Sequence, residues 1–291
     1  MLRDLSPNAR VDAGGMPVLE GFWRHIWADA RHAQIAALAS LLAINIATID
    51  FGATPLASAL AVGACLLTQA IASRWLGIAF DWRSPLITGF SLSLLLRAQT
   101  PWFFALAGVL AIGSKFLLRI DGKHVFNPAG FALVILLLAN AGVWISPGQW
   151  GAELWFAALA GLLAILVLQA ARRADIAIFF LASHAALLGA RALWLGDPLA
   201  IPLHQMQSGS LLIFTFFMIS DPRTSPNSRL GRFSFAFAVA ATGHYLAFFM
   251  QMRPALYFAL IALSPLTLFI DRVFPAPRFA WRKPKLEGAS A

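Results

Sequence analysis

Residues 55–73 read PLASALAVGACLLTQAIAS, an apolar run without a charged residue. A helix of that length spans about 28 Å, close to the roughly 30 Å hydrocarbon core of a bilayer. Hydrophobic residues make up 59% of the chain and charged residues only 12%, about half the share of a soluble protein. The other apolar segments are 32–49, 84–96, 101–118, 127–146, 151–171, 175–195, 207–219, 232–250 and 254–270. The sequence therefore predicts an all-α polytopic membrane protein of about ten transmembrane segments and excludes a soluble enzyme.

The distribution of positive charge predicts the topology. Lys and Arg outnumber Asp and Glu by 22 to 13. With the N-terminus in the cytoplasm, only Arg97, Arg191 and Arg253 fall on the outer side, which is the bias of the positive-inside rule. Both termini are therefore predicted to be cytoplasmic, and the charge needs no nucleic-acid partner. We interpret 1–31 as a cytoplasmic arm with an interfacial amphipathic helix, 32–271 as the transmembrane domain and 272–291 as a basic cytoplasmic tail.

Tryptophan supports these boundaries, because its ring prefers the headgroup region. Seven tryptophans fall at or just beyond the ends of predicted segments: Trp75, Trp82, Trp102, Trp144, Trp150, Trp155 and Trp194. The predicted helices therefore begin and end near the membrane surfaces.

The chain also shows an internal repeat. Segments starting at 32 and 55 recur at 151 and 175, and Gly89 and Gly209 of the two short segments are 120 residues apart. An odd number of segments in each copy means that the copies, 32–146 and 151–271, insert in opposite orientations. Short segments at matching positions of inverted halves indicate a binding site near the membrane midplane. We expect it between 84–96 and 207–219, which are either partial spans or re-entrant elements.

Two polar stretches on the predicted inner side could carry function: KFLLRIDGKHVFNP at 115–128 and SDPRTSP at 220–226. Asn127 and Asp221 each precede a proline, where a short side chain can cap the neighbouring helix end. These residues are consistent with two roles: they cap turns that carry inner-side charges, or they contact a ligand. His184 and His244 lie within predicted spans, where a neutral histidine bonded to a neighbouring helix is favoured over a proton relay.

These motifs resemble the NqrB/RnfD family of membrane subunits. The resemblance covers GFSLSLLLR (89–97), Lys115, FNPA (126–129), FFMISDPRTSP (216–226) and Gly231-Arg232. It implies a ten-helix inverted-repeat fold similar to urea transporters and a flavin held in the membrane subunit. It also implies that electrons pass through a larger complex coupled to Na⁺ or H⁺ movement.

One feature departs from the family. Its members carry FMN covalently on the Thr of a Ser-Gly-Ala-Thr motif in the outer loop between the halves, whereas SPGQW (146–150) is too short to contain it. The chain is thus similar to short RnfD-like relatives, including those associated with enediyne biosynthesis. DFGATPL (50–56) matches part of that motif, Gly-Ala-Thr, but it lies in another loop, and we interpret it as a helix-connecting turn. We expect no covalent flavin, with Thr54 as the weak candidate.

The resemblance thus predicts a membrane subunit of an Rnf/Nqr-like electron transport system in the bacterial inner membrane, rather than a self-sufficient enzyme. It would hold a non-covalent flavin, riboflavin or FMN, and relay electrons. The residues expected to shape the inner side of the flavin site are Lys123, Asn127, Asp221, Arg223 and Thr224. The expected partners are other subunits, flavin-binding electron carriers, the bilayer and quinone. We expect no catalytic residue and no metal site, since no ligand spacing occurs among the six histidines and Cys65 is alone. The alternatives are a small-solute transporter or channel and a cofactor-free assembly subunit on the same scaffold.

Overall fold

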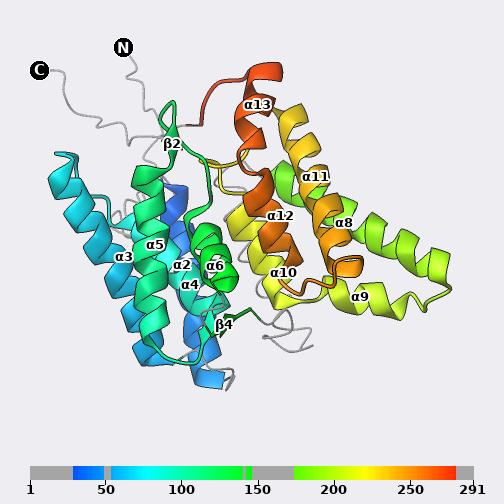
Figure 1. Cartoon of the computed structure of the whole chain (residues 1–291), viewed down its shortest axis with the longest axis horizontal. Coiled ribbons are helices and arrows are strands. Elements are labelled where there is room, and N and C mark those ends of the chain that lie inside the picture. Colours follow the sequence, from blue (N-terminus) through cyan, green and yellow to red (C-terminus); the bar gives the residue numbers. More distant parts are fainter. Residues whose placement is uncertain (1–28, 49–53, 140–141, 146–173, 280–291) are drawn as a thin grey trace, which may run out of the picture.

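The computed structural model describes residues 29–48, 54–139, 142–145 and 174–279, and these are mostly helical (Figure 1). The helices of the first half are α2 (Ala30–Thr48), α3 (Pro55–Trp75), α4 (Arg83–Leu95), α5 (Trp102–Leu117) and α6 (Pro128–Leu138). The second half contains α8 (Ala174–Leu195), α9 (Ala200–Met206), α10 (Gly209–Ile213), the π-helix η1 (Phe214–Ile219), α11 (Arg229–Phe248), α12 (Ala255–Leu263) and α13 (Leu266–Val273). The predicted segment 151–171 and the predicted interfacial helix of the N-terminal arm lie outside the described residues.

Most described helices follow the predicted segments closely, but two predictions were wrong in detail. The segment 127–146 ends as a helix at Leu138, and Gly142, with a positive φ of 65°, precedes the short strand at Val143–Trp144. The segment 254–270 is not one helix: α12 and α13 are bent by 53°. Pro265 stands at the break and has no N–H to continue the helical ladder. The short helix α9 was not predicted.

Two of the described helices, α3 and α8, are long and apolar enough to cross a membrane, and the bent pair α12–α13 would make a third. The apolar helices α5 and α6 and the α10–η1 pair are shorter than that. At 11 residues, α6 is only about 17 Å long. The architecture of ten spans in two inverted repeats therefore remains a prediction.

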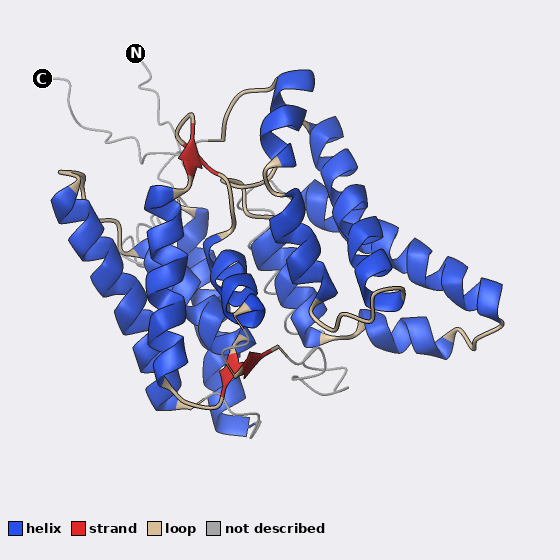
Figure 2. Ribbon diagram, viewed as in Figure 1, coloured by secondary structure: helices blue, strands red, loops and turns tan. Residues whose placement is uncertain are grey.

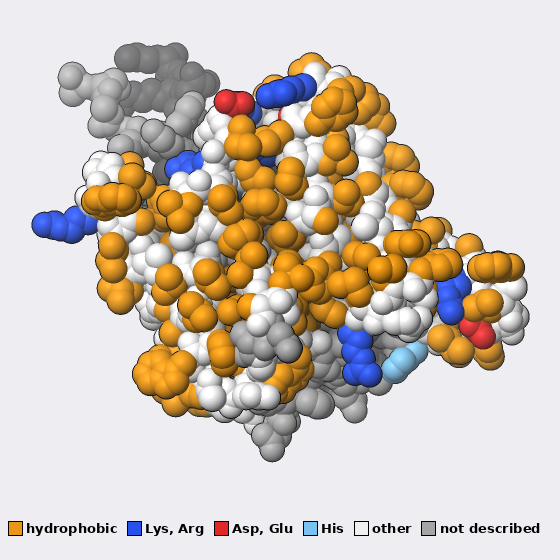
Figure 3. Space-filling view, in the orientation of Figure 1, with side chains coloured by type: hydrophobic (Ala, Val, Ile, Leu, Met, Phe, Trp, Pro, Cys, Tyr) orange, Lys and Arg blue, Asp and Glu red, His pale blue; other side chains and the backbone are white. Residues whose placement is uncertain are grey.

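The outer surface of the bundle has the character expected in lipid. Large apolar side chains point outward along the helices; Leu67, for example, is 62% exposed and Ile178 also 62%. Apolar side chains cover the middle of the face drawn in Figure 3, while most charged side chains lie toward its edges. Trp75, Trp102 and Trp194 are exposed at the ends of α3, α5 and α8, as predicted for interfacial anchors.

The two halves of the described chain pack in the same order. In the first half α3 contacts α4 and α5, and α5 contacts α6; in the second, α8 contacts η1 and α11, and α11 contacts α12. The halves meet along α6 and α12, in the middle of the bundle (Figure 1). Close packing of α3 on α4 depends on Gly89, where a Cβ would lie 2.8 Å from the Cα of Val62.

Two pairs of short strands mark opposite ends of the bundle (Figure 2). Strands β2 (Arg119–Ile120) and β3 (Lys123–His124) form a hairpin whose turn residues, Asp121 and Gly122, both have positive φ. Asp-Gly is typical of this tight turn. Strand β1 (Arg97–Ala98) pairs with β4 (Val143–Trp144). We call these the β2–β3 end and the β1–β4 end; the topology prediction assigns them to the inner and outer sides of the membrane.

Candidate functional site: two cavities at opposite ends of the bundle

The turn at 220–226, which joins η1 to α11, organises the β2–β3 end. One oxygen of Asp221, Oδ1, accepts a hydrogen bond from the Arg223 backbone N–H at 3.0 Å. The other, Oδ2, accepts one from Nδ2 of Asn127 at 3.4 Å. Asn127 also caps α6, since its Oδ1 accepts a hydrogen bond from the Gly130 N–H at 3.0 Å. The capping predicted for the Asn-Pro sequence is therefore confirmed.

Lys123 of the β2–β3 hairpin also contacts this turn, together with Asp271 of α13. Its Nζ lies 2.6 Å from Oδ2 of Asp271 and donates to the carbonyl oxygen of Ser225 at 2.8 Å. Asp271 also accepts hydrogen bonds from the backbone N–H and Nδ2 of Asn227, both at 2.8 Å. Asp271 therefore ties the β2–β3 hairpin, the turn and α13 together. Sequence reasoning missed this residue, although a carboxylate directly after the apolar run 254–270 was a usable signal.

The structure brings the five predicted site residues together, but they do not share one surface. Asn127, Asp221 and Arg223 line a cavity of about 110 Å³. Its walls include Ser84, Thr88 and Ser91 of α4, Phe217 of η1, and the side chains of Arg31, Asp81, Lys115 and His124. The cavity touches both predicted short segments, through α4 and Phe217 of η1, but it lies at the β2–β3 end of the bundle and not at the midplane position predicted from the sequence. Lys123 and Thr224 do not line it; Thr224 is buried in the turn.

This smaller cavity is electrostatically positive around its lining histidine. Burial, followed by the charges of Lys115, Arg223 and Arg119, lowers the pKa of His124 to about 3. Burial also raises the pKa of the Asp221 carboxyl, against the hydrogen bond and charge of Arg223, which lower it. The lowered pKa of His124 and the raised pKa of Asp221 favour the neutral form of each side chain.

The size of this cavity limits what it can hold. Pockets for organic ligands are typically about 300–1,000 Å³, whereas 110 Å³ is on the order of four water volumes. A flavin ring does not fit there unless the turn at 220–226 moves. The role of the five residues in flavin binding stays a prediction.

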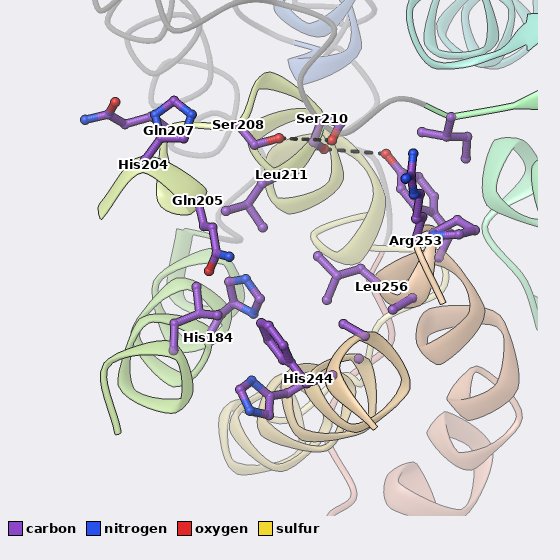
Figure 4. A pocket seen from close by; sticks show the side chains of 18 residues that line it. His184, His204, Gln205, Gln207, Ser208, Ser210, Leu211, His244, Arg253 and Leu256 are labelled. Atoms are coloured by element: carbon purple, nitrogen blue, oxygen red, sulfur yellow. Dashed lines mark hydrogen bonds between the residues drawn. The ribbon is translucent and has the colours of Figure 1, made fainter. Parts of the chain in front are cut away.

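A larger cavity of about 430 Å³ lies at the β1–β4 end, lined mainly by the second half of the chain and by Ile145 at the end of the first (Figure 4). It is lined by α8, α9, α10, α11 and the start of α12, and most of its wall is apolar, including Leu188, Leu211, Phe248 and Leu256. Its polar groups include His184, Gln205, Ser210, His244 and Arg253. Its volume falls within the range of organic-ligand pockets.

The two histidines of this larger cavity have unused hydrogen-bonding capacity. Nδ1 of His184 and Nδ1 of His244 are buried and have no hydrogen-bond partner in the part of the chain that the structure describes. The His184 ring stacks on Phe180, with ring centroids 5.7 Å apart, and the His244 ring lies 4.6 Å from that of Phe248. For these two nitrogens the expected bond to a neighbouring helix is not found. Buried polar atoms are costly without a partner, and a ligand in the cavity would reach these two only after the imidazole rings turn, because neither atom is exposed.

Thr54, the weak candidate for a covalent flavin, and Arg97, predicted on the outer side, lie apart from both cavities. Thr54 is the N-cap of α3, and its Oγ1 accepts a hydrogen bond from the Ala57 N–H at 3.2 Å. It stands before Pro55 in an ordinary helix-starting turn, as interpreted from the sequence. Arg97 is buried at the end of α4, where Nη1 donates to the carbonyl oxygens of Ser93 and Leu96 at 3.2 and 2.7 Å. It satisfies carbonyl groups that the helix end would leave without partners.

Apolar helices with an apolar exterior and tryptophans exposed at their ends define the class: a helical membrane protein. Residues 141–279 match the NQR2, RnfD, RnfE family. The RnfD protein of Stutzerimonas stutzeri, which belongs to an ion-translocating oxidoreductase complex, is 28% identical over 65% of this chain and 73% of its own length. The corresponding protein of Alcanivorax borkumensis is 26% identical over 87% of this chain and 92% of its own. The resemblance to this membrane-embedded family is confirmed.

Proposed function

We propose that this protein is the membrane subunit of an ion-translocating oxidoreductase complex and that it holds a flavin non-covalently. The similarity to RnfD proteins of such complexes over most of the chain supports the first part. Its partners would be the other subunits, flavin-binding carriers or quinone. Its place would be the bacterial cytoplasmic membrane, with ten segments in two inverted repeats and both termini inside.

The larger cavity is the observation that carries the flavin proposal. Its 430 Å³ matches an organic ring system, and its apolar wall would exclude water from the ring. The imidazoles of His184 and His244 line this cavity and could bond the polar edge of the flavin ring. Arg253 would place positive charge near the ring, which favours a reduced, negatively charged form. A bound flavin would supply the one- and two-electron chemistry that protein side chains lack.

The five residues at the β2–β3 end would then act on the inner side of the protein and not on the ring. Asn127, Asp221 and Lys123 fix the turn at 220–226 through the contacts described above. A fixed turn would present a constant surface to partner subunits.

Flavin content of variant proteins tests both the proposal and its placement. The purified chain in detergent should show flavin absorbance and release riboflavin or FMN on denaturation. Ala247→Phe, which fills the larger cavity, should abolish the flavin, whereas Ala190→Phe on the exposed side of α8 should retain it. Asn127→Ala should also retain it.

Loss in Asn127→Ala with retention in Ala247→Phe would instead place the ring at the turn. A colourless protein without extractable flavin would refute the flavin proposal and favour the assembly or transport alternatives. Solute flux in proteoliposomes would distinguish those two.

A further inference from the structure

The charged residues around the smaller cavity at the β2–β3 end indicate a second ligand, independent of the flavin. The charges around it fall into two groups. Arg31 contacts Asp29 and Asp81 at 2.6 and 2.5 Å. Arg83 lies 3.7 Å from Asp29 and 3.6 Å from Asp81. These two cations and two carboxylates compensate one another and leave no net charge.

The second group, Lys115 and Arg223, forms no ion pair among the described residues. Nζ of Lys115 donates to Oε1 of Gln69 at 2.8 Å and to Oγ of Ser84 at 3.0 Å, and both partners are neutral. An ammonium has three N–H groups, so one is left after these two bonds. The exposed guanidinium of Arg223 has no ion pair within the described ranges. Two carboxyl groups line the cavity with them, Asp221 and Asp81, and Asp81 is already paired with Arg31.

Asp221 does not offset both cations. Its two oxygens already accept hydrogen bonds from the Arg223 backbone and from Asn127. Burial disfavours its charged form, since its pKa is raised. After burial, the charges of Lys115 and Arg223 also lower the pKa of His124, so both cations lie near this side of the cavity. The cavity therefore repels a bare cation and attracts an anion.

We propose that this cavity binds a phosphate oxyanion, held by Lys115 and Arg223. Its volume of about 110 Å³ suits a group of five heavy atoms and is too small for a nucleotide. A planar guanidinium matches two oxygens of a phosphate, and the ammonium supplies a point charge opposite. Free phosphate and the headgroup of an anionic phospholipid share this chemistry. Arg223 both lines the cavity and is exposed at the surface, so either source could reach it.

Thermal unfolding of the full chain in nanodiscs tests the proposal. In phosphatidylcholine discs, inorganic phosphate is titrated at constant ionic strength, with sodium chloride as a parallel arm. A second preparation contains phosphatidylglycerol and no added phosphate. A saturable rise in melting temperature with inorganic phosphate identifies a free oxyanion, and a rise only with phosphatidylglycerol identifies a headgroup. Stabilisation by sodium but not by either phosphate source would overturn the proposal, as would no stabilisation at all.

Variants locate the effect. Arg223→Gln and Lys115→Gln should weaken phosphate binding at least about tenfold, as expected for the loss of a charge-assisted hydrogen bond. Arg74→Gln, which removes an exposed cation at the end of α3, should bind phosphate like the parent. The exposed Arg223 variant carries the test if the Lys115 variant fails to fold. Equal phosphate binding by Arg223→Gln and the parent would refute the site.

Discussion

Replacing Lys123 with methionine separates a structural role of this residue from the binding role predicted from the sequence. The change keeps the apolar stem and removes Nζ, which contacts Asp271 at 2.6 Å and the Ser225 carbonyl oxygen at 2.8 Å. The side chains of Lys123 and Asp271 are only 10% and 16% exposed. Asp271 would keep its two hydrogen bonds from Asn227 but lose its counter-charge.

The expected loss of stability follows from that geometry. Removing one partner of a fully buried ion pair costs about 3–5 kcal/mol. The two remaining donors and the partial exposure reduce this to roughly 2–3 kcal/mol for Lys123→Met. For a chain of this size that corresponds to a fall in melting temperature of about 4–8 °C. Intrinsic tryptophan fluorescence during heating in detergent would measure it.

A matched control lies in the same hairpin. Arg119 is exposed, so Arg119→Met should leave the melting temperature within about 1 °C of the parent. Lys123→Met should retain flavin if flavin is present in the parent. A variant that melts like the parent but loses its flavin would refute the structural account and support the binding role instead.

Three further predictions concern other parts of the fold. Stability should fall by up to about 1.4 kcal/mol per pH unit as pH drops from 6.5 toward 3, because only the unfolded chain then protonates His124; His124→Asn should remove this slope in acid unfolding. Gly89→Ala should lower stability by about 1–3 kcal/mol, since its Cβ would lie 2.8 Å from the Val62 Cα; Gly113→Ala in α5, with no atom within 4 Å, should be neutral or stabilising in the same melts. Asp175→Asn should cost about 2 kcal/mol, because the Asp175 carboxylate accepts hydrogen bonds from Nε and Nη2 of Arg232. Arg232→Lys lacks this planar pair of donors and should also lower the melting temperature; two variants that melt like the parent would contradict the prediction.

The sequence determined where the helices lie and how several of them begin. Apolar runs placed α3 and α8 to within two residues at either end, because a bilayer requires about 20 apolar residues in a spanning helix. Asn127 before a proline predicted the cap of α6, since capping depends on neighbours three residues away. The tryptophans also predicted where helices end, because their rings favour the membrane interface, and Trp75, Trp102 and Trp194 lie at the ends of α3, α5 and α8.

Only the tertiary structure decided which side chains meet. Lys123 and Asp271 are 148 residues apart in the sequence, and no local pattern predicts their contact. Helices such as α3 and α8 are apolar on all sides, so periodicity does not show which face packs and which faces lipid. Cavity size depends on that packing, which is why the sequence indicated a polar site between the short helices but neither its small volume nor the larger cavity around His184 and His244.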